Sequence, residues 1–171
     1  MPTKIILVGP MGAGKTTIGR MLAQELGLPF KDVDHMVVEQ AGADIPWIFD
    51  MEGELGFRKR ETQSLLASID GESAIIATGG GIVTQAENRK LLNLQSCVVY
   101  LATSVEQQYQ RTLKDKNRPL LQQSDPRQVL EDLMAIRRPL YEEVADITIE
   151  TDRNRPKAVV NQIISHWNKY A

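Results

Sequence analysis

The chain has 171 residues, 42% hydrophobic and 25% charged, a balance typical of a soluble globular protein with a packed core. Its formal net charge of −2 provides no basic field, so we expect a small-molecule partner and no nucleic acid. The single cysteine, Cys97, excludes an intrachain disulfide and favours a reducing, cytoplasmic compartment. We expect no membrane contact, since the sequence shows neither a signal-peptide pattern nor an apolar run that could cross a bilayer.

The first glycine-rich stretch, residues 9–17, matches the phosphate-binding pattern G-x-x-x-x-G-K-[ST], the P-loop. Residues 4–8 before it predict a buried strand, and residues 17–26 after it predict a helix with one apolar face. Glycines let the chain curl so that backbone N–H groups point at phosphate oxygens, and the helix N-terminus adds partial positive charge. Lys15 can then reach the β- and γ-phosphates, and the Thr16 hydroxyl can bind Mg²⁺.

A short strand is predicted next, around residues 30–33. Asp32 and Asp34 alternate with apolar residues, so both would project to one side, at the strand end where α/β sheets bind ligands. Asp34 could instead be only the N-cap of a helix that begins near His35. No Walker B aspartate ends the strand predicted at residues 74–77, so Asp32, a threonine or water must serve Mg²⁺.

Three helices are predicted between these strands, at residues 36–41, 45–49 and 54–69. Trp47 and Phe49 are equally consistent with simple packing and with the wall of a pocket. Arg58 lies beside the apolar face of the third helix, where an arginine is usually a solvated surface charge. If it lies near the nucleotide crevice, it would favour an acidic acceptor.

Thr78 and three consecutive glycines, Gly79, Gly80 and Gly81, follow the strand at residues 74–77. Such a run loses much backbone entropy on folding, which is justified where another group must approach the backbone closely. A plain flexible turn is the alternative. We expect this turn to open into the same crevice as the P-loop, because parallel strands share their carboxyl edge.

The remaining elements continue the alternation of strands and helices, with helices predicted at residues 86–94 and 104–113 and from 125 and 156 onward, and strands near 97–101 and 146–150. The polar, cationic segment at about 112–124 has the composition of a lid, and its Arg118 could neutralise transition-state charge. This order predicts an α/β fold in one domain, residues 1–171: a five-stranded parallel sheet with helices on both faces.

The motifs in combination closely resemble shikimate kinase, and the resemblance spans nearly the whole chain. It is carried by the P-loop and by residues 32–34 (D-V-D), 56–58 (G-F-R), 78–81 (T-G-G-G), 118–121 (R-P-L-L) and 137–141 (R-R-P-L-Y). The resemblance implies a three-layer P-loop kinase fold with strand order 2-3-1-4-5, a lid, and a monomer. It also implies an acceptor-binding subregion at about residues 33–61.

The resemblance assigns the ATP phosphates to Gly12, Ala13, Gly14, Lys15, Thr16 and Thr17. It assigns Mg²⁺ to Thr16 and, through water, to Asp32, with a threonine where the family commonly has serine. Arg118 would reach the phosphates from the lid, and Arg111 and Asn154 would flank the adenine.

For the acceptor, the resemblance implies that Asp34 bonds the shikimate hydroxyls and orients or deprotonates the 3-hydroxyl. Arg58 and Arg137 would bind the carboxylate, a task suited to forked guanidinium donors. Gly80, flanked by Gly79 and Gly81, would offer its N–H to a hydroxyl. The catalytic residues would be Lys15, Asp34 and Arg118.

The reaction implied is transfer of the γ-phosphoryl group of MgATP to the 3-hydroxyl of shikimate, giving shikimate 3-phosphate and ADP. Gluconate kinase and nucleoside-monophosphate kinases are the competing enzymes. The triple glycine together with R-x-P-L-Y argues against the first, and no base-binding pocket is identifiable for the second. A regulator without turnover is the non-enzymatic alternative, disfavoured by the intact Lys15, Asp34 and Arg118.

Overall fold

The computed structural model describes residues 2–113 and 125–170. Its strands are parallel and form one sheet in the order β2-β3-β1-β4-β5. The strands are β1 (Lys4–Val8), β2 (Phe30–Asp32), β3 (Ala74–Ala77), β4 (Cys97–Ala102) and β5 (Ile147–Glu150). The helices are α1 (Lys15–Leu26), α2 (Val33–Ala41), α3 (Ile45–Ile69), α4 (Ala86–Asn93), α5 (Val105–Thr112), α6 (Pro126–Val144) and α7 (Pro156–Tyr170), with a 3₁₀ turn, η1 (Ile82–Thr84). The predicted fold and strand order are confirmed.

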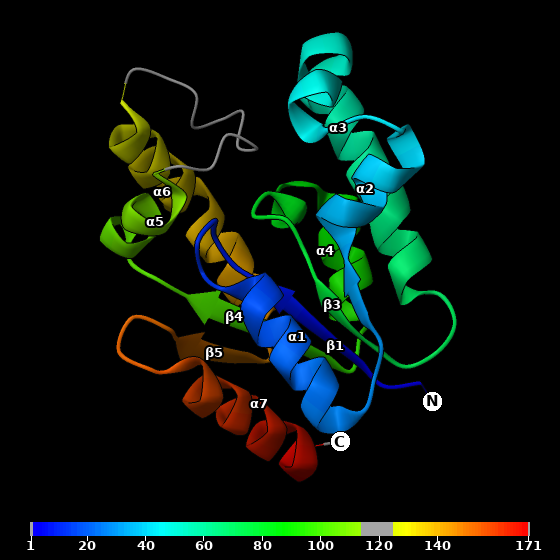
Figure 1. Ribbon diagram of the computed structural model, residues 1–171, viewed down its shortest axis with the longest axis vertical. Coiled ribbons are helices and arrows are strands. Elements are labelled where there is room, and N and C mark those ends of the chain that lie inside the picture. The colour runs from blue at the N-terminus through cyan, green and yellow to red at the C-terminus, as the bar shows by residue number, and fades with distance from the viewer. Residues whose placement is uncertain (1, 114–124, 171) are drawn as a thin grey trace.

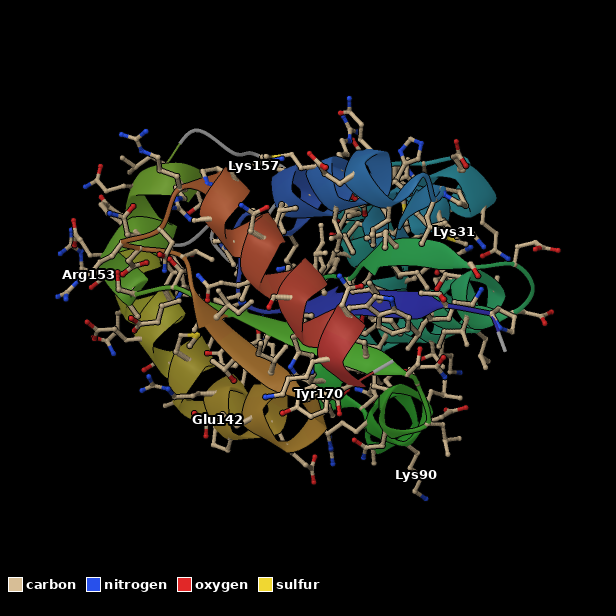
Figure 2. All side chains as sticks on the ribbon, turned by 90° about the horizontal axis from the view of Figure 1, so that it is seen from below. Lys31, Lys90, Glu142, Arg153, Lys157 and Tyr170 are labelled. Carbon is tan, nitrogen blue, oxygen red and sulfur yellow. The ribbon has the colours of Figure 1, made fainter. Side chains whose placement is uncertain are left out.

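Helices cover both faces of the sheet, with α1 and α7 on one side and α4 and α6 on the other (Figures 1 and 2). The central strand β1 shows why. Its Ile5 and Leu7 belong to the core cluster beneath α1 and α7, whereas Ile6 and Val8 belong to the cluster on the opposite face. Successive side chains of a strand point to opposite faces, so a strand that is apolar throughout must be covered twice.

The junction of β2 and α2 differs from the prediction. The strand ends at Asp32 and α2 begins at Val33, so Asp34 lies in the first helical turn and does not share a strand face with Asp32. The N-cap is Asp32, whose Oδ1 accepts a hydrogen bond from the backbone N–H of His35 at 3.3 Å. The alternative that made Asp34 the N-cap is therefore wrong. A capping carboxylate stabilises an early helix start, which the strand pattern alone does not reveal.

The long helix α3 carries a kink at Gly53, where φ is 71° and ψ is 179°. The kink separates two helical stretches close to those predicted at residues 45–49 and 54–69. Phe49 packs against Phe57, with ring centroids 4.9 Å apart, in a small core between α2 and α3. Trp47 is 47% exposed, so it is not a core residue.

Candidate active site

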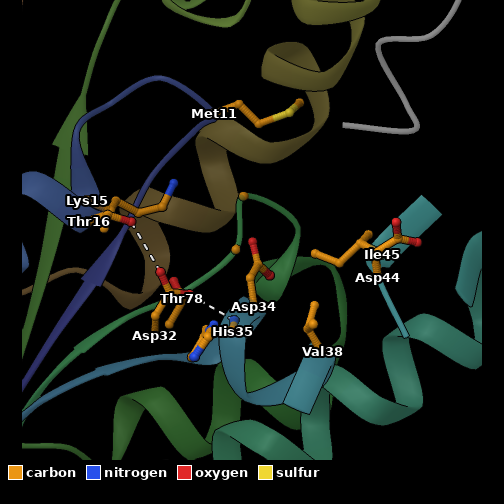
Figure 3. Close-up of a pocket in the computed structure, with 12 residues that line it drawn as sticks. Met11, Lys15, Thr16, Asp32, Asp34, His35, Val38, Asp44, Ile45 and Thr78 are labelled. Atoms are coloured by element: carbon orange, nitrogen blue, oxygen red, sulfur yellow. Dashed lines mark hydrogen bonds between the residues drawn. The ribbon is translucent and has the colours of Figure 1, made fainter. Parts of the chain in front are cut away.

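The carboxyl ends of β1, β2 and β3 open into a cavity of about 360 Å³ (Figure 3). The P-loop, the β2–α2 junction, the start of α3 and the turn after β3 all contribute residues. They are Met11, Lys15, Thr16, Asp32, Asp34, His35, Val38, Asp44, Ile45, Thr78, Gly79 and Gly80. Figure 3 shows Asp34 projecting from α2 into the middle of this group. The predicted crevice thus brings the P-loop, both aspartates and the glycine turn (residues 79–81) together.

The P-loop holds Lys15 close to its own backbone. Lys15 Nζ donates to the carbonyl oxygens of Gly9 and Pro10 at 2.6 and 2.8 Å. Gly9 has φ 149°, and a Cβ there would lie 2.6 Å from the Leu101 carbonyl oxygen, so only glycine fits. The close approach of the loop to β4 therefore requires glycine at position 9.

Thr16 and Asp32 lie side by side at the base of the cavity. Thr16 Oγ1 donates to Asp32 Oδ2 at 3.2 Å, so one carboxylate both caps α2 and contacts the first turn of α1. A hydroxyl and a carboxylate are oxygen ligands of the kind Mg²⁺ prefers, and its sites usually combine one or two carboxylates with substrate phosphates and water. The donor set therefore fits the metal. Within residues 2–113 and 125–170, no cluster of three or more His, Cys, Asp or Glu side chains offers a competing site.

Arg58 and Arg137 are buried beside this cavity, with exposed fractions of 6% and 5%. Arg58 is not the solvated charge that helix surfaces usually carry. Its guanidinium donates to Glu61 Oε1 at 2.8 Å and to Glu54 Oε1 at 3.3 Å. Burial lowers the pKa of Arg137, and the nearby Arg58 lowers it further. We call Asp34, Arg58, Glu61 and Arg137 the charged cluster.

Glu61 is a site residue that the sequence reasoning did not identify. Its side chain is 1% exposed, and burial raises its pKa to about 7; Arg58 opposes that rise and Asp34 adds to it. Among the described residues, its Oε2 has no hydrogen-bond partner. The spacing of Arg58 and Glu61, three residues apart on a predicted helix, was a signal that could have found the pair.

The glycine turn packs tightly against the charged cluster. A Cβ on Gly79 would lie 2.8 Å from Asp34 Oδ1 and 2.9 Å from Glu61 Oε2, and one on Gly81 would lie within 2.6 Å of the Arg58 guanidinium. Gly79 and Gly81 are therefore glycine because charged groups approach the backbone, as the sequence suggested, and not because of positive φ angles.

A second cavity, of about 280 Å³, lies on the other side of the P-loop. It is lined by Ala13, Gly14, Thr17, Ile18, Arg111, Thr151, Asn154, Pro156 and Val159. Arg111 on α5 donates to the Gly12 carbonyl oxygen at 2.6 Å, and Asn154 donates to the Glu150 carbonyl oxygen at 2.7 Å. The two residues expected near the adenine thus share one pocket with the P-loop. Arg118 and most of the predicted lid lie outside the described residues.

The family model for shikimate kinase matches residues 11–168. The chain belongs to the shikimate kinase family. A shikimate kinase of Chromohalobacter salexigens is 59% identical over 166 residues, which cover 96% of this chain and 91% of the relative. A shikimate kinase of Pseudomonas aeruginosa is 54% identical over 165 residues, which cover 96% of each chain.

Solved structures of shikimate kinases share the fold. The Acinetobacter baumannii enzyme in complex with shikimate superposes with a TM-score of 0.95 and 51% identity, over 99% of this chain and 94% of that one. The Aquifex aeolicus enzyme gives a TM-score of 0.84 at 32% identity, over 97% and 96% of the two chains. Shikimate kinases use MgATP, so the chain is an ATP-dependent kinase, a transferase. No described helix is both long and apolar enough to span a membrane.

Proposed function

We propose that this shikimate kinase family member transfers the γ-phosphoryl group of MgATP to the 3-hydroxyl of shikimate, giving shikimate 3-phosphate and ADP. The observation that carries the proposal is that the P-loop and the glycine turn line one cavity, with two buried guanidiniums, Arg58 and Arg137, packed against that turn. An acceptor with a carboxylate and several hydroxyls matches this donor set, since forked guanidiniums pair with carboxylates. The shikimate bound to the Acinetobacter baumannii relative supports the same acceptor.

On the nucleotide side, the P-loop residues Gly12, Ala13, Gly14, Lys15, Thr16 and Thr17 hold the phosphates. Lys15 brings its charge to the transferred group, and Arg111 and Asn154 flank the adenine. Thr16 and, through water, Asp32 would hold Mg²⁺, which would neutralise phosphate charge when bound. Arg118, which lies outside the described residues, neutralises part of the negative charge of the phosphates.

On the acceptor side, Asp34 accepts a hydrogen bond from the 3-hydroxyl and takes its proton as the new P–O bond forms. Arg58 and Arg137 hold the carboxylate, and the Gly80 N–H donates to a hydroxyl. Gly79 and Gly81 let the charged cluster approach. Positioning and charge neutralisation supply most of the rate, because phosphoryl transfer needs little covalent chemistry from the protein.

The proposal extends to the domain organisation, the oligomeric state and the compartment of the enzyme. We propose a single kinase domain over residues 1–171 that acts as a cytoplasmic monomer, with no nucleic-acid or membrane partner. The near-neutral formal charge of −2 supports the absence of a nucleic-acid partner. Light scattering of the purified protein at assay concentration gives the oligomeric state directly.

The test is ADP release, coupled to an indicator enzyme, with MgATP and one of shikimate, gluconate, AMP or no acceptor. Rapid release with shikimate alone is expected. Release with gluconate or AMP instead would overturn the assignments of Asp34, Arg58 and Arg137 while keeping the P-loop. No release with any acceptor would contradict the proposed turnover and favour a regulator.

A further inference from the structure

Tyr141 of α6 is fully buried, and its hydroxyl points at the glycine turn. The hydroxyl donates to the Gly80 carbonyl oxygen at 2.5 Å, across 61 residues of sequence. Its ring packs against Tyr100 of β4, with centroids 5.0 Å apart. Burial raises the pKa of the Tyr141 phenol, so the hydroxyl keeps its proton and remains a donor.

The Gly80 carbonyl is held differently from its two neighbours. The Gly79 carbonyl accepts from the Ile82 N–H at 3.2 Å, and the Gly81 carbonyl accepts from the N–H and hydroxyl of Thr84 at 3.1 and 2.8 Å. Those bonds stay within the turn and η1, whereas the bond to Gly80 comes from α6. Three glycines in a row have wide backbone freedom. The Tyr141 bond therefore fixes the middle of the turn relative to α6.

Arg137 lies one helical turn before Tyr141, on the same face of α6. Its guanidinium lies 3.4 Å from where a Cβ of Gly80 would be. Burial lowers the pKa of Arg137, and the neighbouring Tyr141 phenol opposes that shift. The Tyr141 phenol therefore lies next to both groups to which we assign the acceptor: the backbone of Gly80, whose N–H we assign to a hydroxyl, and Arg137, which we assign to the carboxylate.

We propose that Tyr141 is a positioning residue. It fixes the backbone of Gly80 and the Arg137 guanidinium relative to each other, so that shikimate engages both at once. The inference rests on the proposed function. Tyr141 lines neither the first cavity nor the second, so it acts only through these two groups. Loss of the Tyr141 hydroxyl should weaken binding of the acceptor and leave binding of the nucleotide unchanged.

Tyr141→Phe removes only the hydroxyl and keeps the packing against Tyr100. We expect the KM for shikimate to rise about tenfold, because the Gly80 carbonyl loses its buried donor, while the KM for MgATP stays unchanged. The matched control is Tyr100→Phe. Tyr100 is 2% exposed, and burial raises the pKa of its phenol. Its charged neighbours are Arg138 and Glu142 rather than the charged cluster, so loss of its hydroxyl should leave the KM for shikimate unchanged.

An unchanged KM for shikimate in Tyr141→Phe, or an equal rise in both variants, overturns the inference. A rise in both KM values also overturns it, since that pattern reports general loosening.

A parent enzyme without shikimate-dependent ADP release refutes the proposed function and this inference with it, whereas an active parent with an unaffected Tyr141→Phe refutes this inference alone. Should Tyr141→Phe not fold, 3-fluorotyrosine at position 141 keeps the ring and alters the donor strength. A KM for shikimate equal to that of the parent then overturns the inference.

Discussion

The two sides of the active-site cleft differ in the elements that form them and in the burial of their residues. The nucleotide side comes from one contiguous loop and from exposed residues, with Thr16, Thr17 and Arg111 all open to solvent. The acceptor side comes from α2, α3, α6 and the turn after β3, and its Arg58, Glu61 and Arg137 are almost fully buried.

This difference matches the ligand that we propose for each side. Phosphates are recognised by backbone N–H groups, which a nine-residue loop supplies in any P-loop protein. A small polyol acid offers few atoms, so it must meet fixed charges whose positions are set by tertiary packing. An unpaired buried charge is costly, and the buried Arg58 guanidinium is paired with both Glu61 and Glu54. We therefore expect variants on the two sides to separate cleanly in kinetics.

The largest effect should come from Lys15→Ala on the nucleotide side. Removing the charge above the transferred group should lower kcat by about a thousandfold or more. Steady-state ADP release measures it, with thermal unfolding as the control for an intact fold. Near-normal turnover would remove the P-loop lysine from the mechanism.

Asp34→Asn should come next, because an amide cannot take the proton of the attacking hydroxyl. We expect kcat to fall by about a hundredfold or more with no change in nucleotide affinity. A nucleotide titration of the variant checks that the two sides separate. The proposed role of Asp34 does not survive a rate equal to that of the parent.

Arg58→Lys keeps a positive charge beside Glu61 but loses the guanidinium fork. The KM for shikimate should rise about tenfold to thirtyfold, with the KM for MgATP unchanged. Arg60→Ala is the control, since Arg60 lies on the same helix and its guanidinium donates to Glu52 at the exposed surface rather than to the charged cluster. An equal response of both variants would show that the effect is not specific to the acceptor side.

Glu61→Gln should give the smallest effect, seen in stability rather than turnover. The pKa of Glu61 is about 7 in the folded chain against an ordinary value of 4.5, so the folded state keeps a proton that the unfolded state releases. This contribution to stability is complete below pH 4.5 and is lost as pH rises through about 7. Denaturant unfolding of parent and variant at several pH values tests it. The parent's unfolding free energy should fall relative to that of Glu61→Gln between pH 4.5 and 7, and parallel curves would contradict the buried, proton-holding carboxyl.

The sequence predicted the fold well because the signals for its elements are local. The P-loop, the alternation of strands and helices, and the helix ends at Gly27 and Gly42 all depend on neighbouring residues. Two of the predicted helices began at residues 104 and 125, and in the structure Ser104 and Asp125 are the N-caps that accept the backbone N–H bonds there.

The acceptor side was less accessible to such reasoning. Its residues are far apart in sequence. The position of Arg58 on a predicted helix favoured a solvated surface charge, and only the family resemblance indicated a role in the site. Glu61 and Tyr141 were missed as site residues because their importance arises from contacts with Arg58 and Gly80 that no local pattern specifies. The position of Asp34 was also misread, since a cap by Asp32 begins α2 directly after the strand.

The central claim is that the two sides bind their ligands separately. Equilibrium titrations of shikimate and of MgATP against the parent, Arg58→Lys and Arg111→Ala test it most directly. We predict that Arg58→Lys weakens shikimate alone and that Arg111→Ala, which removes a bond to the P-loop carbonyl of Gly12, weakens MgATP alone. Loss of MgATP affinity in Arg58→Lys, or of shikimate affinity in Arg111→Ala, would contradict the account.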